Sequence, residues 1–202
     1  MSKVKQMDQA KQQQPPFYGK WSEVLDDYFA FLQTKGGMTY PADLIPEAML
    51  DQERESDFEG IGCWTTIPST ITEEEILELE QFYAHKLPAS FKQFLQYKFY
   101  LDLEVGGHGW RIFDLLPTKR LGYWMDEMNW NYAEQISANY LPFGESDHLI
   151  LCLNANEPGE DYNYPVGMYD PFEESFEVLA KDFSQFGSDV EAWLADWKSH
   201  RK

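Results

Sequence analysis

The sequence predicts an α+β fold, with an antiparallel-type sheet, helices packed on it and an N-terminal helical extension. Amphipathic helical patterns occur near both ends of the chain and over residues 72–101. Short apolar runs separated by turn residues, typical of strands, lie between the middle and the last helical patterns. Helices that enclose a run of strands favour this architecture. We expect a mobile tail at 1–16, a helical extension at 17–60 and a single domain at 61–202.

The extension begins after a polar, Gln- and Lys-rich segment that ends in Pro15-Pro16. Apolar residues at helical spacing follow from Trp21 to Leu32, and Gly36-Gly37 provides a C-terminal stop. An isolated helix of this length is marginal, so it must dock on the rest of the chain or on a partner. We favour docking within the chain. Residues 38–60 contain a short helix near 43–51 and then a charged connection.

Two amphipathic helices are predicted in the middle of the chain. The first begins at Thr72, which has capping-box spacing to Glu75, and three glutamates fill its first turn. Its apolar face carries Ile76, Leu79 and Tyr83. The second begins at Pro88, because proline loses no hydrogen bond in a first turn. Its stripe consists of Phe91, Phe94, Leu95 and Phe99.

The later elements follow from apolar runs and turn residues. Extended segments are expected at 63–67 and 110–115, a turn at 106–109, and a helix within 118–140. The apolar run 149–153 indicates a buried strand, and 154–164 a loop. A hairpin over 166–170 and 175–180 and a final helix over 183–197, with Gly187 inside it, complete the chain.

The order of several short motifs resembles the SUKH superfamily. A Glu-rich helix start is followed by LPASFKQFL (87–95) and a Gly-Gly pair, then by LPFGESDHLILCLN (141–154), PVGMYD (165–170) and DFSQF (182–186). The resemblance spans about Ile61 to Trp197 and implies a SUKH-like α+β domain. It does not include the Trp21–Leu32 helix.

The charge balance limits the classes of partner. The chain has 35 acidic and 16 basic residues, for a net charge of -19. Nucleic acids and anionic membranes attract Lys and Arg, so we expect neither as a partner. A basic protein is favoured, with faster encounter as a consequence. The alternative is that the charge only keeps the protein soluble.

The cysteines and the hydropathy indicate a cytoplasmic protein. Cys63 and Cys152 make no disulfide framework. The N-terminal residues lack the apolar run of a signal peptide, and no window has the length of a membrane span.

No catalytic residue, metal site or cofactor is predicted. The motif Gly106-Gly107-His108-Gly109 precedes a strand and has no nearby lysine, so we interpret it as a turn and not as a phosphate loop. The histidines lack paired ligand spacing, and no GxSxG elbow is present. Cys152 lies in an apolar run, where thiols are normally inert.

Clusters of aromatic and acidic residues are the best candidates for binding a protein partner. Rings supply buried area and carboxylates pair with Lys or Arg of the partner. The candidates are Trp124, Asp126, Glu127, Trp130, Glu145, Asp147, Glu160, Asp161 and Tyr162. In the alternative, Trp124 and Trp130 belong to the core and the acids only solvate loops.

The resemblance implies a non-enzymatic immunity protein that neutralises a cognate toxin domain, often a nuclease, by covering its basic cleft. A regulatory scaffold similar to the fungal cell-wall assembly regulators is the second hypothesis. An enzyme with an unrecognised site is the third. The sequence leaves the identity of the partner and the oligomeric state open.

Overall fold

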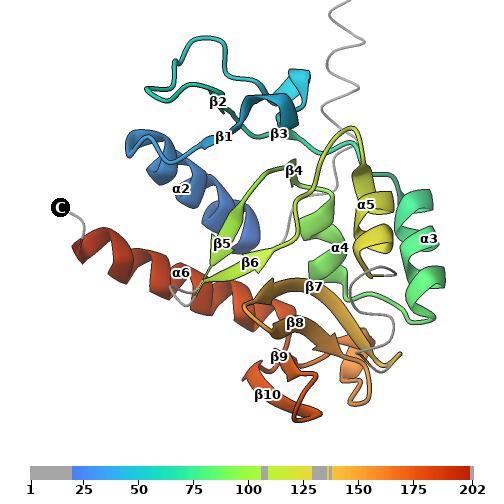
Figure 1. Cartoon of the computed structure of the whole chain (residues 1–202). Coiled ribbons are helices and arrows are strands. Elements are labelled where there is room, and N and C mark those ends of the chain that lie inside the picture. Colours follow the sequence, from blue (N-terminus) through green and yellow to red (C-terminus); the bar gives the residue numbers. More distant parts are fainter. Residues whose placement is uncertain (1–19, 106–108, 129–135, 137, 201–202) are drawn as a thin grey trace, which may run out of the picture.

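The computed structural model describes residues 20–105, 109–128, 136 and 138–200 (Figure 1). The predicted tail at 1–16, most of the expected turn at 106–109 and Trp130 lie outside these residues. The described part confirms an α+β fold in which helices pack on an antiparallel sheet.

Six of the described strands form an antiparallel sheet in the order β10-β9-β8-β7-β6-β5. Its members are β5 (Leu103–Val105), β6 (Trp110–Ile112), β7 (Tyr140–Ser146), β8 (Leu149–Asn154), β9 (Val166–Asp170) and β10 (Ser175–Ala180). The predicted strand at 149–153 is confirmed as a central strand, buried from Ile150 onward. The predicted hairpin is confirmed as β9–β10.

The helices cover the sheet and meet it in an aromatic core. They are α3 (Glu73–Tyr83), α4 (Ala89–Leu95), α5 (Arg120–Glu127) and α6 (Phe183–His200). Phe91 of α4, Phe143 of β7 and Phe183 of α6 are fully buried, and their ring centroids lie 4.8–5.6 Å apart. Residues from three elements therefore hold helices and sheet together.

The start of α3 confirms the predicted capping box. The Thr72 hydroxyl accepts a hydrogen bond from the Glu75 N–H, and the Glu75 carboxylate accepts one from the Thr72 N–H at 2.9 Å. The predicted inner stripe of Ile76, Leu79 and Tyr83 is buried. Local sequence chemistry therefore places this helix correctly.

The N-terminal extension docks within the chain, as favoured. Helix α2 (Lys20–Thr34) packs on α6, and the Trp21 indole N–H donates to the carbonyl of Phe183 at 2.9 Å. Strand β1 (Thr39–Pro41) pairs with β2 (Ile61–Cys63). The division between 17–60 and 61–202 stays a prediction, while in the described structure both parts share one hydrophobic core.

Several local expectations were wrong. The helix near 43–51 is two separate 3-10 turns, η1 (Ala42–Leu44) and η2 (Glu47–Met49), because Pro46 interrupts it. The second middle helix ends at Leu95, since β4 (Lys98–Phe99) pairs with β3 (Ile67–Pro68). The 110–115 strand stops at Ile112.

Candidate partner-binding site

Trp124 is corrected from a surface anchor to a core residue. It is fully buried, with ring contacts to Phe91 and Phe113, and its indole N–H donates to the Asp114 carbonyl at 2.9 Å. A partner cannot reach this side chain in the folded protein. Trp130, its predicted companion, is outside the described residues.

The acidic residues of α5 are accessible. Asp126 is exposed on the last turn of the helix, and Glu127 is half-buried. The Tyr123 hydroxyl donates a hydrogen bond to the Glu127 carboxylate, and burial together with this bond raises the pKa of the hydroxyl. Helix α5 packs beside α3.

The sheet separates the remaining predicted residues into two groups. Half-buried Glu145 and exposed Asp147 lie where β7 turns into β8. Exposed Glu160, Asp161 and Tyr162 lie in the loop that follows the other end of β8. Six residues of strand separate these groups by about 17–20 Å, given a rise of ~3.3 Å per residue. One small contact surface therefore cannot include both groups.

Hydrogen bonds fix the base of the loop over residues 156–162. The buried Asn154 side chain accepts from the Asn156 N–H at 3.0 Å, and the Asn139 amide donates to Asn156 at 2.8 Å. The Gly159 N–H donates to the Asn163 carbonyl at 2.8 Å, which closes the turn. These contacts hold the loop in one conformation at its base.

The loop tip has an uncommon backbone. Asp161 and Tyr162 adopt φ values of 54° and 60°. Residues other than glycine, asparagine and aspartate rarely occupy this left-handed region, so Tyr162 is the uncommon case. The Tyr162 side chain is 54% exposed. Such strain is often retained where a binding surface needs it.

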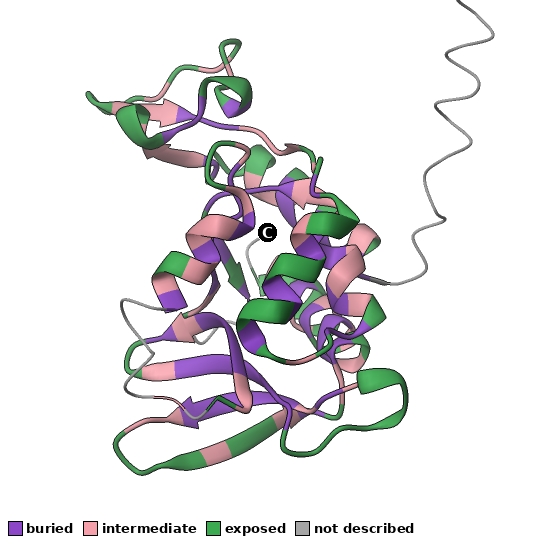
Figure 2. Cartoon of the chain, turned by 90° about the vertical axis from the view of Figure 1, so that its right-hand side faces the viewer, coloured by how far each residue is buried: buried purple, intermediate pink, exposed green. Residues whose placement is uncertain are grey.

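The loop adjoins the C-terminal end of α3. The Tyr164 hydroxyl donates to the carbonyl of Lys86, the third residue after the helix, at 2.8 Å. On the outer side of α3, exposed Glu74, Leu77, Glu78 and Gln81 follow helical spacing, with Phe82 beside them. Figure 2 looks onto the side where α3 lies in Figure 1, and exposed residues run along the outer turns of the nearest helix.

We call this surface the α3 face: Glu74, Leu77, Glu78, Gln81, Phe82, Glu160, Asp161 and Tyr162. Exposed apolar and aromatic side chains stand among carboxylates, and Leu77 is 47% exposed. Leu77 and Phe82 were missed in the sequence. Both are apolar residues out of phase with the buried stripe of Ile76, Leu79 and Tyr83, and that signal could have found them.

The inner carboxylates of α3 are already neutralised. Buried Glu80 accepts hydrogen bonds from the Lys86 ammonium at 2.7 Å and from the Leu87 N–H at 3.0 Å, and it pairs with Lys92 at 2.5 Å. Burial acts to raise the pKa of Glu80, but these partners together lower it. The uncompensated charge of this region therefore lies on the outer α3 face.

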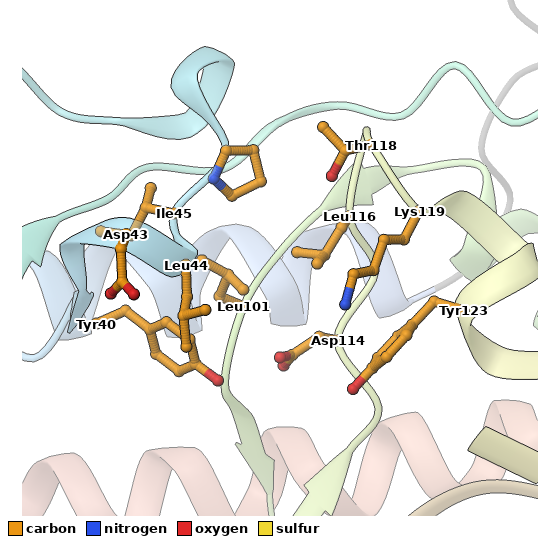
Figure 3. Close-up of a pocket in the computed structure, with 11 residues that line it drawn as sticks. Tyr40, Asp43, Leu44, Ile45, Leu101, Asp114, Leu116, Thr118, Lys119 and Tyr123 are labelled. Carbon is orange, nitrogen blue, oxygen red and sulfur yellow. The ribbon is translucent and has the colours of Figure 1, made fainter. Parts of the chain in front are cut away.

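A hollow of about 340 Å³ lies between the extension and the core (Figure 3). Tyr40 and Leu44 come from the extension, and they face Asp114, Lys119 and Tyr123 across the hollow. The ammonium of Lys119 lies over the Tyr123 ring, 4.4 Å from its centroid.

Asp114 is the one buried carboxylate among the described residues that line this hollow, and burial raises its pKa. Perturbed carboxylates are candidates for acid–base catalysis. Here both oxygens are occupied: Oδ1 accepts from the Asp102 N–H at 2.8 Å and Oδ2 from Arg111 Nη2 at 3.3 Å. The described lining includes no histidine or cysteine, so a structural ion pair accounts for this carboxylate.

The thiols and histidines of the described residues assemble no reactive group. Burial raises the pKa of the Cys152 thiol, which suits an inert cysteine. His148 lies beside Asp170, with Nε2 3.7 Å from a carboxylate oxygen. The described residues contain no cluster of three or more metal-ligating side chains.

Within the described ranges, none of the helices is both long enough and apolar enough to cross a membrane.

Comparison with known proteins supplies the family. Residues 70–189, more than half of the chain, match the model of the SMI1/KNR4 family (SUKH-1). No curated protein matches the chain. The matched region begins at residue 70 rather than near 61 and ends at 189 rather than near 197, and it includes α3, α5 and the 156–162 loop. Proteins of this family generally interact with other proteins and are generally non-catalytic. The chain belongs to the SMI1/KNR4 family (SUKH-1).

Proposed function

We propose that the protein is an immunity protein that binds a basic toxin domain through the α3 face and thereby covers the toxin's active cleft. The supporting observation is the combination of exposed Leu77, Phe82 and Tyr162 with outward-facing carboxylates on one helix and one tightly held loop. Apolar anchors among charges of one sign are suited to a partner of the opposite charge.

Rigidity supports binding at this surface. Helix α3 is capped at its start, and the loop base is fixed by its asparagines, so little conformational entropy is lost on association. The net charge of -19 accelerates encounter with a cationic cleft. Neutralisation then needs only steric occlusion, and the protein acts in the cytoplasm without catalysis or cofactor. A nuclease fits this mechanism, because its substrate cleft must be basic.

A regulatory scaffold, similar to the fungal cell-wall regulators, is a second candidate function. Separate exposed aromatic side chains favour it. Phe172 is 81% exposed in the β9–β10 turn, and exposed Phe58 lies in the connection after η2. Neither residue belongs to the α3 face, and separate anchors suit several partners. A toxin gene immediately upstream would favour the immunity function.

The direct experiment is co-expression with a basic toxin domain encoded next to this protein, with cell growth as the readout. We expect the wild-type protein to protect and a Glu78→Lys/Glu160→Lys variant to fail. These positions are exposed, and they avoid Asp161, where lysine would add backbone strain. A Glu55→Lys/Asp57→Lys variant changes the net charge equally at exposed sites outside the α3 face and should still protect.

The Tyr162→Asn variant removes the aromatic anchor and keeps the carboxylates of the α3 face, so it tests the ring apart from the charge. Asparagine tolerates the φ of 60° at this position, so the fold should be kept while affinity for the toxin falls by about tenfold. If both α3-face variants protect as well as the wild type, this surface is not the toxin interface.

A further inference from the structure

A groove of about 720 Å³ lies between the C-terminal parts of α2 and α6. Figure 1 shows these ends on the left and α3 on the right, so the groove is remote from the α3 face. Most of its lining lies outside residues 70–189. These lining residues come from α2, the segment after it and the end of α6. Parts of this chain beyond the matched family region therefore build the groove.

Its floor is aromatic. The Trp193 and Trp197 rings stack with centroids 5.3 Å apart and planes 13° from parallel. Phe31 meets Trp197 edge-on, with 4.9 Å between the ring centroids. All three side chains are only partly buried, and the two tryptophans pack against the core. Trp197 also stacks with Tyr28, with 6.5 Å between the ring centroids, whereas Trp197 is the one described ring partner of Trp193, so Trp193 is the ring on which a ligand can stack.

Cations already lie over one of these rings, that of Phe31. The Lys198 ammonium lies 5.4 Å from the Phe31 centroid and the Lys35 ammonium 5.8 Å from it. Tryptophan attracts cations more strongly than phenylalanine does. Trp193 thus offers a better surface for a cation than the Phe31 ring, which the chain's own lysines occupy.

The walls are acidic. Asp102 and Glu104 stand at β5, Asp196 stands on α6, and all three are exposed. Among the described lining residues, Lys35 is the permanent cation, and His200 lies 3.6 Å from Asp196. The groove therefore combines an aromatic floor with carboxylates on two sides.

We propose that this groove binds an arginine-bearing segment of a protein partner, as a second site that does not depend on toxin neutralisation. A guanidinium is planar and weakly hydrated, so it stacks on Trp193 while its edge pairs with Glu104 or Asp196. Lysine would pair with the carboxylates but stack less well. A neutral peptide would lose both interactions.

The test uses the full chain and a fluorescein-labelled peptide of alternating arginine and glycine, with binding measured by fluorescence anisotropy. Glu104→Lys/Asp196→Lys should weaken binding by about tenfold or more. Trp193→Leu keeps the carboxylates and should weaken binding by about threefold. Glu55→Lys/Asp57→Lys, with the same change in net charge, should change it less than about twofold. Replacing arginine with lysine in the peptide should reduce affinity, and replacing it with glutamine should abolish binding.

Two results would overturn the proposal. Equal weakening by both charge-reversal variants would mean that the peptide responds only to net charge. Absence of peptide binding, together with a dimer in sedimentation that Glu104→Lys/Asp196→Lys dissociates, would assign the groove to a second copy of this chain. Circular dichroism of each variant confirms that the substitutions leave the fold intact.

Discussion

Glu75 has two roles that can be separated experimentally. It completes the capping box of α3, and it pairs with Arg120 at the start of α5, where Nη2 lies 2.6 Å from Oε2. The hydrogen bonds from Arg120 lower the pKa of Glu75 from 4.5 to about 2, against the effect of burial. The capping role was predicted from spacing, whereas the ion pair with a residue 45 positions away was not.

We expect Glu75→Gln to lower the free energy of unfolding by about 1–2 kcal/mol near neutral pH, after allowance for solvent screening. Glutamine keeps the capping box, so the loss reports the ion pair. Because the folded pKa lies below the unfolded one, the stabilisation is complete above pH 4.5 and disappears as the pH falls towards about 2. Urea unfolding across this pH range measures it.

Glu74→Gln is the matched control. Glu74 is the exposed neighbour of Glu75 and should cost less than about 0.5 kcal/mol. If the two variants lose the same stability at every pH, the Glu75–Arg120 pair does not stabilise the fold.

Residue types alone could not assign the candidate site. Trp124 and Tyr162 both stood near acidic residues in the sequence, yet the first is fully buried and the second is half exposed. Tertiary packing around Phe91 and Phe113 decides this difference. Glu160 and Asp161 could be predicted as exposed because acidic loops are rarely buried.

At the scale of elements, the contact between α2 and α6 depends on a glycine. A Cβ atom at Gly187 would lie 2.7 Å from Trp21 Nε1 and 2.8 Å from Trp21 Cε2. Trp21 cannot move aside, because its ring packs against Phe94 and Phe183 at centroid distances of 5.0 and 4.9 Å. The glycine inside the predicted final helix is therefore the residue that lets the extension dock.

Gly187→Ala should therefore destabilise the protein by about 1–3 kcal/mol through overpacking, in spite of the better helix propensity of alanine. Gly122→Ala in α5 is the control, since a Cβ there meets no atom within 4 Å. It should stabilise by up to about 1 kcal/mol. Denaturant unfolding compares the two, and an equal gain from both would contradict close packing of α2 on α6.

The elements that the sequence predicted well are those with local causes. Thr72, Pro88 and the inner apolar stripes placed α3 and the start of α4. Strand β7 was missed because it contains Pro142 and Gly144, residues that disfavour strands. A register shift between them accommodates the proline, and a Cβ at Gly144 would lie 2.5 Å from the Arg111 carbonyl oxygen. The need for glycine at this position follows from the close approach of the neighbouring strand β6, so the sequence of β7 alone does not show it.

At the scale of the whole molecule, the order of several motifs along the chain predicted the family, which no single motif could do alone. The family match covers the sheet, and it also includes α3 and the 156–162 loop, which together carry the α3 face. The α2–α6 groove is built mostly outside the match, and it could not be predicted from the family resemblance. The net charge of -19 predicted a basic partner but not which surface meets it.

The most direct test of the central claim is a pull-down from cells with the purified protein as bait, at low and high salt, followed by mass spectrometry. We expect one basic toxin-like protein to be retained at low salt and weakened at high salt, because the encounter is electrostatic. It should be lost with the Glu78→Lys/Glu160→Lys bait and kept with the Glu55→Lys/Asp57→Lys bait. Absence of any such toxin-like protein, or its equal capture by all baits and at both salt concentrations, would contradict an acidic immunity protein that acts through the α3 face.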